Sequence, residues 1–424
     1  LIIFSFLFYK DDMFHPSIMT VIPVTGVALI IWFAGKKDYI SKILSTKFFV
    51  SIGLISYSLY LYHYPLFSFA RISGLVSGDV VKKIILALFI IFFSISSYFL
   101  IERPFRKKGL ISKKKLVGSI LVFLIIICSF NFLAIKQEGF KSRVPEILQK
   151  EIRKTNTIFN TSGKNGTVVL IGDSHAGTLE YNLNKNLKQR GYKLERFFTD
   201  FYINGFNLVN RKTNENKKEF PIINRNIKTY LAQNKELILV FHHRSTVKLL
   251  ETYFDNKEGG IENRYQKNRD WEEYIEPINK KTTSKSQRKK FIEKAFVKDI
   301  EEIHSMGHKI IIIYPVPEVG FDVPRKIYNE IIVKKQKEIK LFSTSYDVFK
   351  ERNEETFKLF DSIKLKNIYR IYPHTHLCNK IIKNRCVVNS QKDILYWDDD
   401  HLSLKGSELV VNDILEKLKI IDKN

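Results

Sequence analysis

Long apolar runs without charge dominate the first third of the chain. Each contains about the ~20 apolar residues that a helix needs to cross the hydrocarbon core of a membrane. Buried helices of soluble proteins are usually shorter and keep a polar face. The runs predict four membrane spans, at about 16–35, 48–71, 83–101 and 116–135.

Residues 1–8 have the composition of the end of a fifth span. The chain begins with Leu, and it has neither the basic start nor the small-residue cleavage site of a signal peptide. We therefore expect the chain to be a fragment, with residues 1–135 forming the C-terminal part of a membrane domain.

The rest of the chain has a different pattern. Short aliphatic runs at 168–171, 237–241 and 310–314 are typical of strands buried in a parallel sheet. Between them, apolar residues recur at helical spacing, and this alternation predicts a three-layer α/β domain over 161–424, after a linker at 136–160. Residues 245–285 are rich in Asn, Lys, Glu and Gly, which favours a surface insertion.

Charge refines this division. The net charge is +25, with 15 Lys and Arg against 5 Asp and Glu in residues 1–135, and 54 against 39 in residues 136–424. The loops 36–47 and 102–115 together hold eleven Lys and Arg, and the alternate connections hold four. The positive-inside rule places those two loops in the cytoplasm and residues 136–424 outside it. We therefore expect no nucleic-acid partner for the domain that carries most of the charge, and an anionic envelope as its surroundings.

Candidate chemistry begins where the first strand of this domain ends. The strand 167–171 runs into Gly172-Asp173-Ser174-His175, and a helix is expected to follow. A serine at such a turn has its hydroxyl at the carboxyl edge of the sheet, beside helix N–H groups that can stabilise an oxyanion. Because Asp and Ser are also common helix caps, a plain cap is the alternative.

A second group of polar residues stands near the end of the chain, at Asp398-Asp399-Asp400-His401. Asp398 precedes His401 by three residues, so its carboxylate can accept the imidazole N–H within one turn. The other ring nitrogen is then free to act as a base toward a serine. A cation site or a solvated acidic turn are the alternatives.

These two motifs together resemble the first and last blocks of the SGNH hydrolases. The resemblance implies Ser174 as nucleophile and one oxyanion donor, His401 as base and Asp398 as its orienting partner. For the middle blocks, Gly205 is the candidate oxyanion glycine. Where the hydrolases have an asparagine donor, this chain has His242-His243-Arg244, and Arg244 is the candidate replacement. A surface salt bridge is the alternative for Arg244.

The membrane part resembles the late helices of the acyltransferase family 3. The motifs are residues 55–66 (ISYSLYLYHYPL) and 101–106 (IERPFR), with His15-Pro16-Ser17 before them and the joint 139–145 after them. The resemblance implies O-acylation, usually O-acetylation, of a cell-envelope polysaccharide such as lipopolysaccharide, or of a lipid-linked glycan. Acetyl-CoA would be the donor to the membrane domain, and the chain itself would hold no cofactor or metal.

Two other functions fit the same residues. A carbohydrate esterase of the SGNH type would use the same Ser, His and Asp with water as acceptor. A membrane-anchored carbohydrate-binding module would need no base aimed at a serine, so the intact set disfavours it.

The three cysteines fall into two groups. Cys128 lies in the last predicted span and is expected to be a buried thiol. Cys378 and Cys386 lie in the domain placed outside, where disulfides persist, and we predict a bond between them. His374 and His376 next to Cys378 could instead indicate zinc, although their spacing fits no common site.

Overall fold

The computed structural model describes residues 1–9, 17–35, 38–73, 75–76, 80–107, 112–149, 163–262, 270–282, 284–333, 335–336 and 338–423. Contacts between residues divide the chain into two compact units, Leu1–Lys136 and Gln137–Asn424.

The first unit is helical. Ser17 caps the second helix with its hydroxyl, and Pro23 and Pro65 lie inside α2 and α4. A π-helical turn, η1, continues α5 into α6. The helices are α1 (Ile2–Phe8), α2 (Ile18–Phe33), α3 (Tyr39–Leu44), α4 (Lys47–Ile72), α5 (Val80–Ser97), η1 (Tyr98–Glu102), α6 (Arg103–Arg106) and α7 (Lys113–Lys136).

Two helices in the described part of the chain are long and apolar enough to cross a membrane, judged by length and composition. They are Val80–Arg106 and Lys113–Lys136, both with a mean hydropathy of 2.6, and they cover the predicted spans 83–101 and 116–135. At the other two predicted spans, α2 has only 16 residues, and the serines, tyrosines and His63 of α4 keep it outside this class.

The two motifs of the first unit contact each other. The hydroxyl of Ser58, on α4, donates a hydrogen bond of 3.0 Å to Glu102 at the end of η1. Glu102 also pairs with Arg106 at 2.5 Å. His63 bonds through Nδ1 to the carbonyl of Tyr60, so its ring is tied to its own helix. His15, from the third motif, lies outside the described residues.

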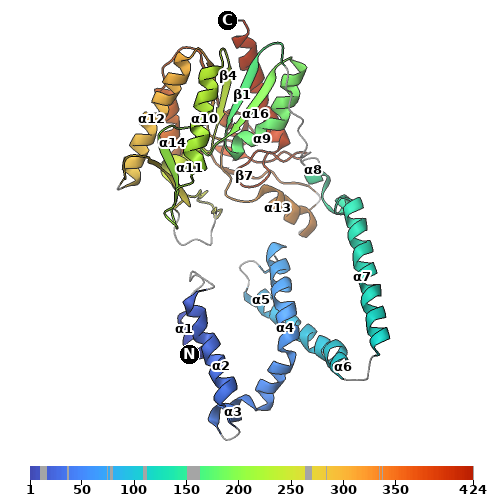
Figure 1. The fold of residues 1–424 in the computed structure, drawn as a ribbon. Helices are drawn as coiled ribbons and strands as arrows, with labels where there is room; N and C mark the ends of the chain where they lie inside the picture. The colour runs from blue at the N-terminus through green and yellow to red at the C-terminus, as the bar shows by residue number, and fades with distance from the viewer. Residues whose placement is uncertain are drawn as a thin grey trace. The chain divides into compact units, whose positions relative to one another are not determined.

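A five-stranded parallel sheet forms the centre of the second unit (Figure 1), in the order β2-β1-β4-β6-β8. The central strands are buried apart from the first residues of β1 and β6, as their aliphatic sequences predict. The strands are β1 (Thr167–Gly172), β2 (Lys193–Phe198), β4 (Ile238–His242), β6 (Lys309–Ile313) and β8 (Ile368–Ile371).

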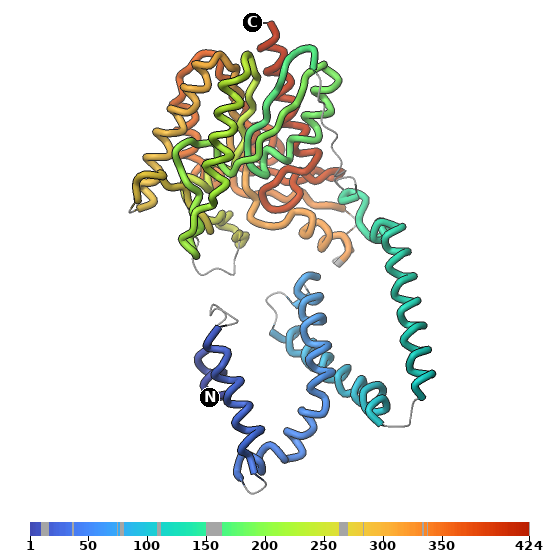
Figure 2. The backbone as a smooth tube through the Cα atoms, in the orientation of Figure 1, coloured from blue at the N-terminus to red at the C-terminus, as the bar shows by residue number. Residues whose placement is uncertain are grey.

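Alternate residues of each central strand enter two separate hydrophobic cores. On one face, Val168 and Leu170 pack with α9 (Ser174–Gln189) and α16 (Leu404–Ile421), which lie against each other (Figure 2). On the other face, Val169 and Ile171 pack with α10 (Glu219–Gln233), α12 (Lys285–Ser305) and α14 (Tyr346–Ser362). These layers make the unit a three-layer α/β domain.

Shorter elements connect the layers. The segment 245–285, expected to be a surface insertion, instead contains the buried helix α11 (Ser245–Leu250) and the strand β5 (Glu273–Pro277). β5 pairs with β3 (Phe206–Asn210). The polar composition of the segment therefore gave no sign of this strand. The others are η2 (Lys141–Arg143), α8 (Glu146–Gln149), α13 (Val323–Tyr328), η3 (Asn329–Val333), β7 (Ser343–Ser345), α15 (His374–Leu377) and β9 (Arg385–Val387).

Candidate active site

The order of the strands creates a topological switch point at the carboxyl ends of β1 and β4. After β1 the chain adds β2 on one side, and later strands are added on the other side of β1. In open α/β sheets such a switch point is where ligands bind. Gly172 and His242 are paired in register at this edge, and a Cβ on Gly172 would lie 1.9 Å from the carbonyl oxygen of His242. Only glycine allows the two strands to approach so closely.

Asp173 fixes the turn between β1 and α9. One carboxylate oxygen accepts the N–H of His175 at 2.9 Å, which caps the helix. The other accepts the backbone N–H of Arg244 at 2.8 Å, which ties this turn to the loop after β4. Asp173 is therefore the cap that the sequence offered as an alternative, and it leaves Ser174 exposed at the first position of α9.

The turn 398–401 brings the second motif to the same edge. One oxygen of Asp398 accepts the backbone N–H groups of Asp400, at 3.0 Å, and of His401, at 2.8 Å. Ser403 then caps α16 by accepting the N–H of Gly406. Because α16 packs on α9, the turn before α16 lies beside the start of α9.

The predicted nucleophile, base and orienting carboxylate lie in hydrogen-bond contact. The Nε2 atom of His401 is 2.7 Å from the Oγ atom of Ser174. The Nδ1 atom of His401 is 2.8 Å from the second oxygen of Asp398. In this arrangement an imidazole that holds its proton on Nδ1 can take the proton of the serine hydroxyl on Nε2.

Asp400 contacts the same imidazole, which the sequence did not predict. Its Oδ1 atom is 2.8 Å from Nδ1 of His401, and its Oδ2 atom is 3.2 Å from Nε2 of His175. His175 is part of the Gly-Asp-Ser-His motif, but the motif alone gave no reason to assign it a partner so far along the chain. Both Asp400 and His175 are buried.

Burial and hydrogen bonds oppose each other in setting the pKa of these groups. Burial disfavours the imidazolium of His401, but its hydrogen bonds to Asp398 and Asp400 outweigh burial and raise the pKa to about 10. Burial alone would raise the pKa of Asp400, but hydrogen bonds from His175 and His401 and the charge of Arg244 hold it well below the usual range. Burial and the neighbouring carboxylates raise the pKa of Asp399 to about 7.

Arg244 does not have the position expected of an oxyanion donor. Its Nε atom donates to Glu318 at 2.9 Å, and its Nη1 and Nη2 atoms donate to Glu262 at 2.9 and 2.8 Å. Nη1 is also 3.0 Å from Asp400. Since carboxylates engage all three nitrogens, the guanidinium acts as a buried counter-charge. Its side chain is only 12% exposed, so the surface salt bridge weighed as the alternative does not describe it either.

Gly205 lies at the start of β3, where φ is +79° and its carbonyl accepts the N–H of Ile278 at 3.0 Å. The neighbouring Asn204 donates its N–H to Asp299. These bonds anchor Gly205 to the β3–β5 pair and to α12. Its role as an oxyanion donor stays a prediction.

Cys378 and Cys386 form a disulfide in the structure. Zinc binding by His376 and Cys378 is therefore not favoured, because Cys378 is bonded to Cys386 and His376 contacts Asp413 at 2.8 Å. Cys128 is a free cysteine on α7, one of the two helices apolar and long enough to cross a membrane, and no other described part of the protein covers it. No residue of α7 between 113 and 136 is buried by other parts of the protein.

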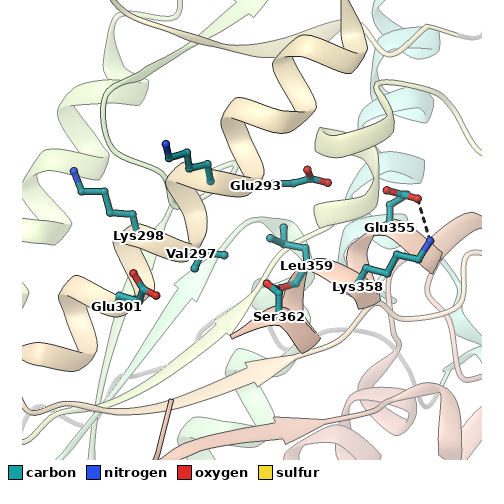
Figure 3. Close-up of a pocket in the computed structure, with 9 residues that line it drawn as sticks. Glu293, Val297, Lys298, Glu301, Glu355, Lys358, Leu359 and Ser362 are labelled. Atoms are coloured by element: carbon teal, nitrogen blue, oxygen red, sulfur yellow. Dashed lines mark hydrogen bonds and ion pairs between the residues drawn. The ribbon is translucent and has the colours of Figure 1, made fainter. Parts of the chain in front are cut away.

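A surface pocket lies elsewhere, between α12 and α14 (Figure 3). It is lined by a mixture of Lys, Glu and aliphatic side chains, and none of the predicted site residues lines it. The lining residues are Glu293, Lys294, Val297, Lys298, Glu301, Glu355, Lys358, Leu359 and Ser362.

Ser174, His401 and Asp398 thus lie in hydrogen-bond contact at the switch point of a three-layer α/β domain. A family model described as "SGNH domain (fused to AT3 domains)" matches residues 146–416. The chain belongs to this family of SGNH domains.

The proteins similar to this chain include two from Staphylococcus aureus, strains COL and N315, each named "Putative O-acetyltransferase". Each is 37% identical over 105 residues, which is 24% of this chain. The match spans only 16% of the length of these relatives.

The solved structures similar to this chain include two of low sequence identity. One is the periplasmic domain of a lipopolysaccharide acetyltransferase from Salmonella ser. Paratyphi A, 16% identical, with a TM-score of 0.38 over 68% of this chain and 95% of that one. The other is an acetyl xylan esterase, 14% identical, with a TM-score of 0.31 over 59% of this chain and 98% of that one.

Proposed function

We propose that the chain belongs to an O-acyltransferase, most simply an O-acetyltransferase, that modifies a cell-envelope glycan. The observation that carries this proposal is the set of hydrogen bonds joining Ser174, His401 and Asp398 in a domain of a family fused to AT3 domains. Such a set serves covalent acyl transfer.

In the first half of the proposed reaction, Ser174 attacks the acyl carbon of a donor. A bond forms between Oγ and that carbon, and the bond to the leaving group breaks. The hydroxyl proton passes to Nε2 of His401 and then to the leaving group. The oxyanion that forms lies near the N-terminus of α9, where helix N–H groups have no helical partner.

In the second half, a sugar hydroxyl attacks the acyl carbon of the ester. His401 takes the proton of the sugar, and the oxygen of Ser174 leaves and regains a proton from His401. The exposure of Ser174 supports an acceptor as large as a glycan. With water as acceptor, the same steps would be those of an esterase.

The location and the donor are further parts of this proposal. The first unit would be a multi-pass segment of a cell membrane among its lipids, with the SGNH domain outside the cytoplasm, as the charge bias of the loops suggests. Acetyl-CoA would supply acyl groups to the complete membrane domain on the cytoplasmic side.

The test uses the full chain in detergent micelles with p-nitrophenyl acetate as donor, with and without an oligosaccharide acceptor. We expect acetylated sugar in the presence of acceptor and an acetyl group on the peptide that contains Ser174. Ser174→Ala should lower the rate by roughly three orders of magnitude, whereas the exposed Ser305→Ala should not change it.

The other outcomes are equally informative. Free acetate alone, even with acceptor, would favour the esterase. No turnover by a folded chain would favour the binding module, and full activity of Ser174→Ala would refute Ser174 as the nucleophile.

A further inference from the structure

The imidazole of His401 has two carboxylates at one nitrogen. Its Nδ1 atom is 2.8 Å from Oδ2 of Asp398 and 2.8 Å from Oδ1 of Asp400. A ring nitrogen carries one proton, so the two acceptors share one N–H. Ordinary orientation of a catalytic histidine needs only one of them.

The two carboxylates differ in their surroundings. The side chain of Asp398 is 35% exposed, and that of Asp400 is 6% exposed. Water therefore competes for Asp398 more than for Asp400. A charge–dipole contact is stronger where water is excluded, so the contact of His401 with Asp400 is the better protected one.

Partners on two other elements fix Asp400. Its Oδ2 atom faces Nη1 of Arg244 at 3.0 Å and Nε2 of His175 at 3.2 Å. A buried carboxylate is kept ionised only by such partners. Arg244 comes from the loop after β4 and His175 from the start of α9, so the carboxylate joins the turn 398–401 to the segments that follow β4 and β1.

The carboxylate of Asp398 has a second task. Its Oδ1 atom accepts the backbone N–H groups that shape the turn, and only Oδ2 faces the imidazole. Asp400 has no such share in the turn among the described contacts, since its oxygens face side chains. Asp398 therefore shapes the turn as well as contacting the ring, whereas the carboxylate of Asp400 contacts only side chains, the ring of His401 among them.

We propose that Asp400 is a second positioning residue for His401, held in place by Arg244 and His175. This inference rests on the proposed function, in which His401 is the base for Ser174. Asp400 touches neither nucleophile nor acceptor in this scheme. It acts through His401, by fixing the ring and by stabilising the imidazolium that forms when the serine proton arrives.

The other charged and titratable groups near this pair come from several segments. Glu318 and Glu262 neutralise Arg244 from the far side, and Asp399 adds a carboxyl group in the same turn. His242, at the end of β4, lies behind His175, and burial keeps its pKa low. None of these groups lies as close to Nδ1 of His401 as the two carboxylates do.

The experiment replaces Asp400 by Asn in the full chain in detergent. The value of kcat/KM for p-nitrophenyl acetate is measured against pH, and the rate of Ser174→Ala is subtracted. The rising limb of this pH profile reports the pKa of the base in the free enzyme. Loss of a carboxylate at hydrogen-bond distance should move this limb down by about 1 to 3 pH units. The rate on the plateau should fall, and Asp400→Glu should restore the limb.

Two comparisons separate positioning from a structural effect. Asp413→Asn removes the carboxylate from a different histidine pair, with His376, and should leave the limb unchanged. Asp398→Asn should stay measurably faster than His401→Ala, because Asp400 still accepts the Nδ1 proton. This second variant tests the proposal even if Asp400→Asn does not fold.

The results that overturn the proposal are distinct from those that overturn the proposed function. An unchanged limb in folded Asp400→Asn, or an Asp398→Asn rate equal to that of His401→Ala, would refute the role of Asp400 alone. Full activity of Ser174→Ala would refute the proposed function instead.

Discussion

Replacing Arg244 by Met is the most direct test of the buried charge network. Met keeps much of the side-chain volume but removes the charge that faces Glu318, Glu262 and Asp400. The exposed fractions of these carboxylate side chains are 5%, 15% and 6%. The substitution would therefore leave three poorly hydrated carboxylates close together.

The expected loss follows from the partners that remain. Glu318 keeps Arg352 at 3.0 Å, Asp400 keeps its two histidines, and Glu262 still accepts the N–H of Phe254. Breaking a buried ion pair costs about 3 to 5 kcal/mol. Because each carboxylate retains at least one contact, we expect the lower end, about 3 kcal/mol, or a fall in Tm of roughly 6 to 12 °C.

The assay is unfolding followed by tryptophan fluorescence. Trp271 stacks on the guanidinium of Arg244 at 5.3 Å and reports on this region. The loss should be smaller at pH 5 than at pH 7.5, because carboxylates that lose their counter-charge have raised pKa values and protonate more readily. The stability of Arg244→Lys should fall between those of wild type and Arg244→Met, since lysine keeps the charge but lacks the planar set of guanidinium donors.

A surface pair supplies the control. Lys257 and Glu351 are 55% and 69% exposed, so Lys257→Met should cost less than about 1 kcal/mol. A loss below 1 kcal/mol in Arg244→Met, or a loss that does not shrink at lower pH, would refute the buried network.

Three further predictions concern stability. A Cβ on Gly406 would lie 2.1 Å from the carbonyl oxygen of Leu395, so Gly406→Ala should destabilise the domain by about 1 to 3 kcal/mol in chemical denaturation. Replacing Cys378 and Cys386 by Ser opens a loop with a sequence separation of 8, which should cost about 2.5 kcal/mol and be matched by adding reductant to wild type. Because the pKa of His401 is raised to about 10, its protonated ring should stabilise the fold fully below pH ~6.5 and less and less as pH rises to about 10. The difference in the free energy of unfolding between wild type and His401→Gln should decline over that window.

Each of these has its own contrary result. Gly177→Ala meets only a flexible arginine end at 3.4 Å, so equal losses at Gly177 and Gly406 would contradict the steric reason. An unchanged denaturation midpoint after reduction would contradict a stabilising disulfide. A constant difference between wild type and His401→Gln from pH 6.5 to 10 would contradict the raised pKa.

The sequence predicted the centre of the fold better than its edges. β1, β4 and β6 are buried on both faces, so they are unbroken aliphatic runs that stand out in the sequence. β2 lies at one edge of the sheet and mixes three charged residues with its apolar ones, from Lys193 to Phe198. β8 lies at the other edge and is only four residues long, so neither edge strand could be recognised from aliphatic runs.

The site divides in the same way. The contact of Asp398 with His401 depends on a three-residue spacing, which the sequence displays. The second contact of the imidazole depends on where α9, the loop after β4 and the turn 398–401 meet, and tertiary packing alone decides that. Arg244 is the clearest example of what the sequence could not predict. Its place after β4 put it near the site, but only the three carboxylates that contact it in the structure show that it balances their charge.

The charges around the site also explain a division of labour in the proposed reaction. The second unit carries a net positive charge, yet two carboxylates contact His401, and Ser174 stands at the N-terminus of α9. When the serine proton moves, positive charge develops on His401, next to two carboxylates, and negative charge develops on the oxyanion, next to the start of α9. Each developing charge therefore meets groups of the opposite sign that are already in place. Arg244 has to stay on the far side of Asp400 for this to work, since a free guanidinium beside the imidazolium would raise the free energy of that charge.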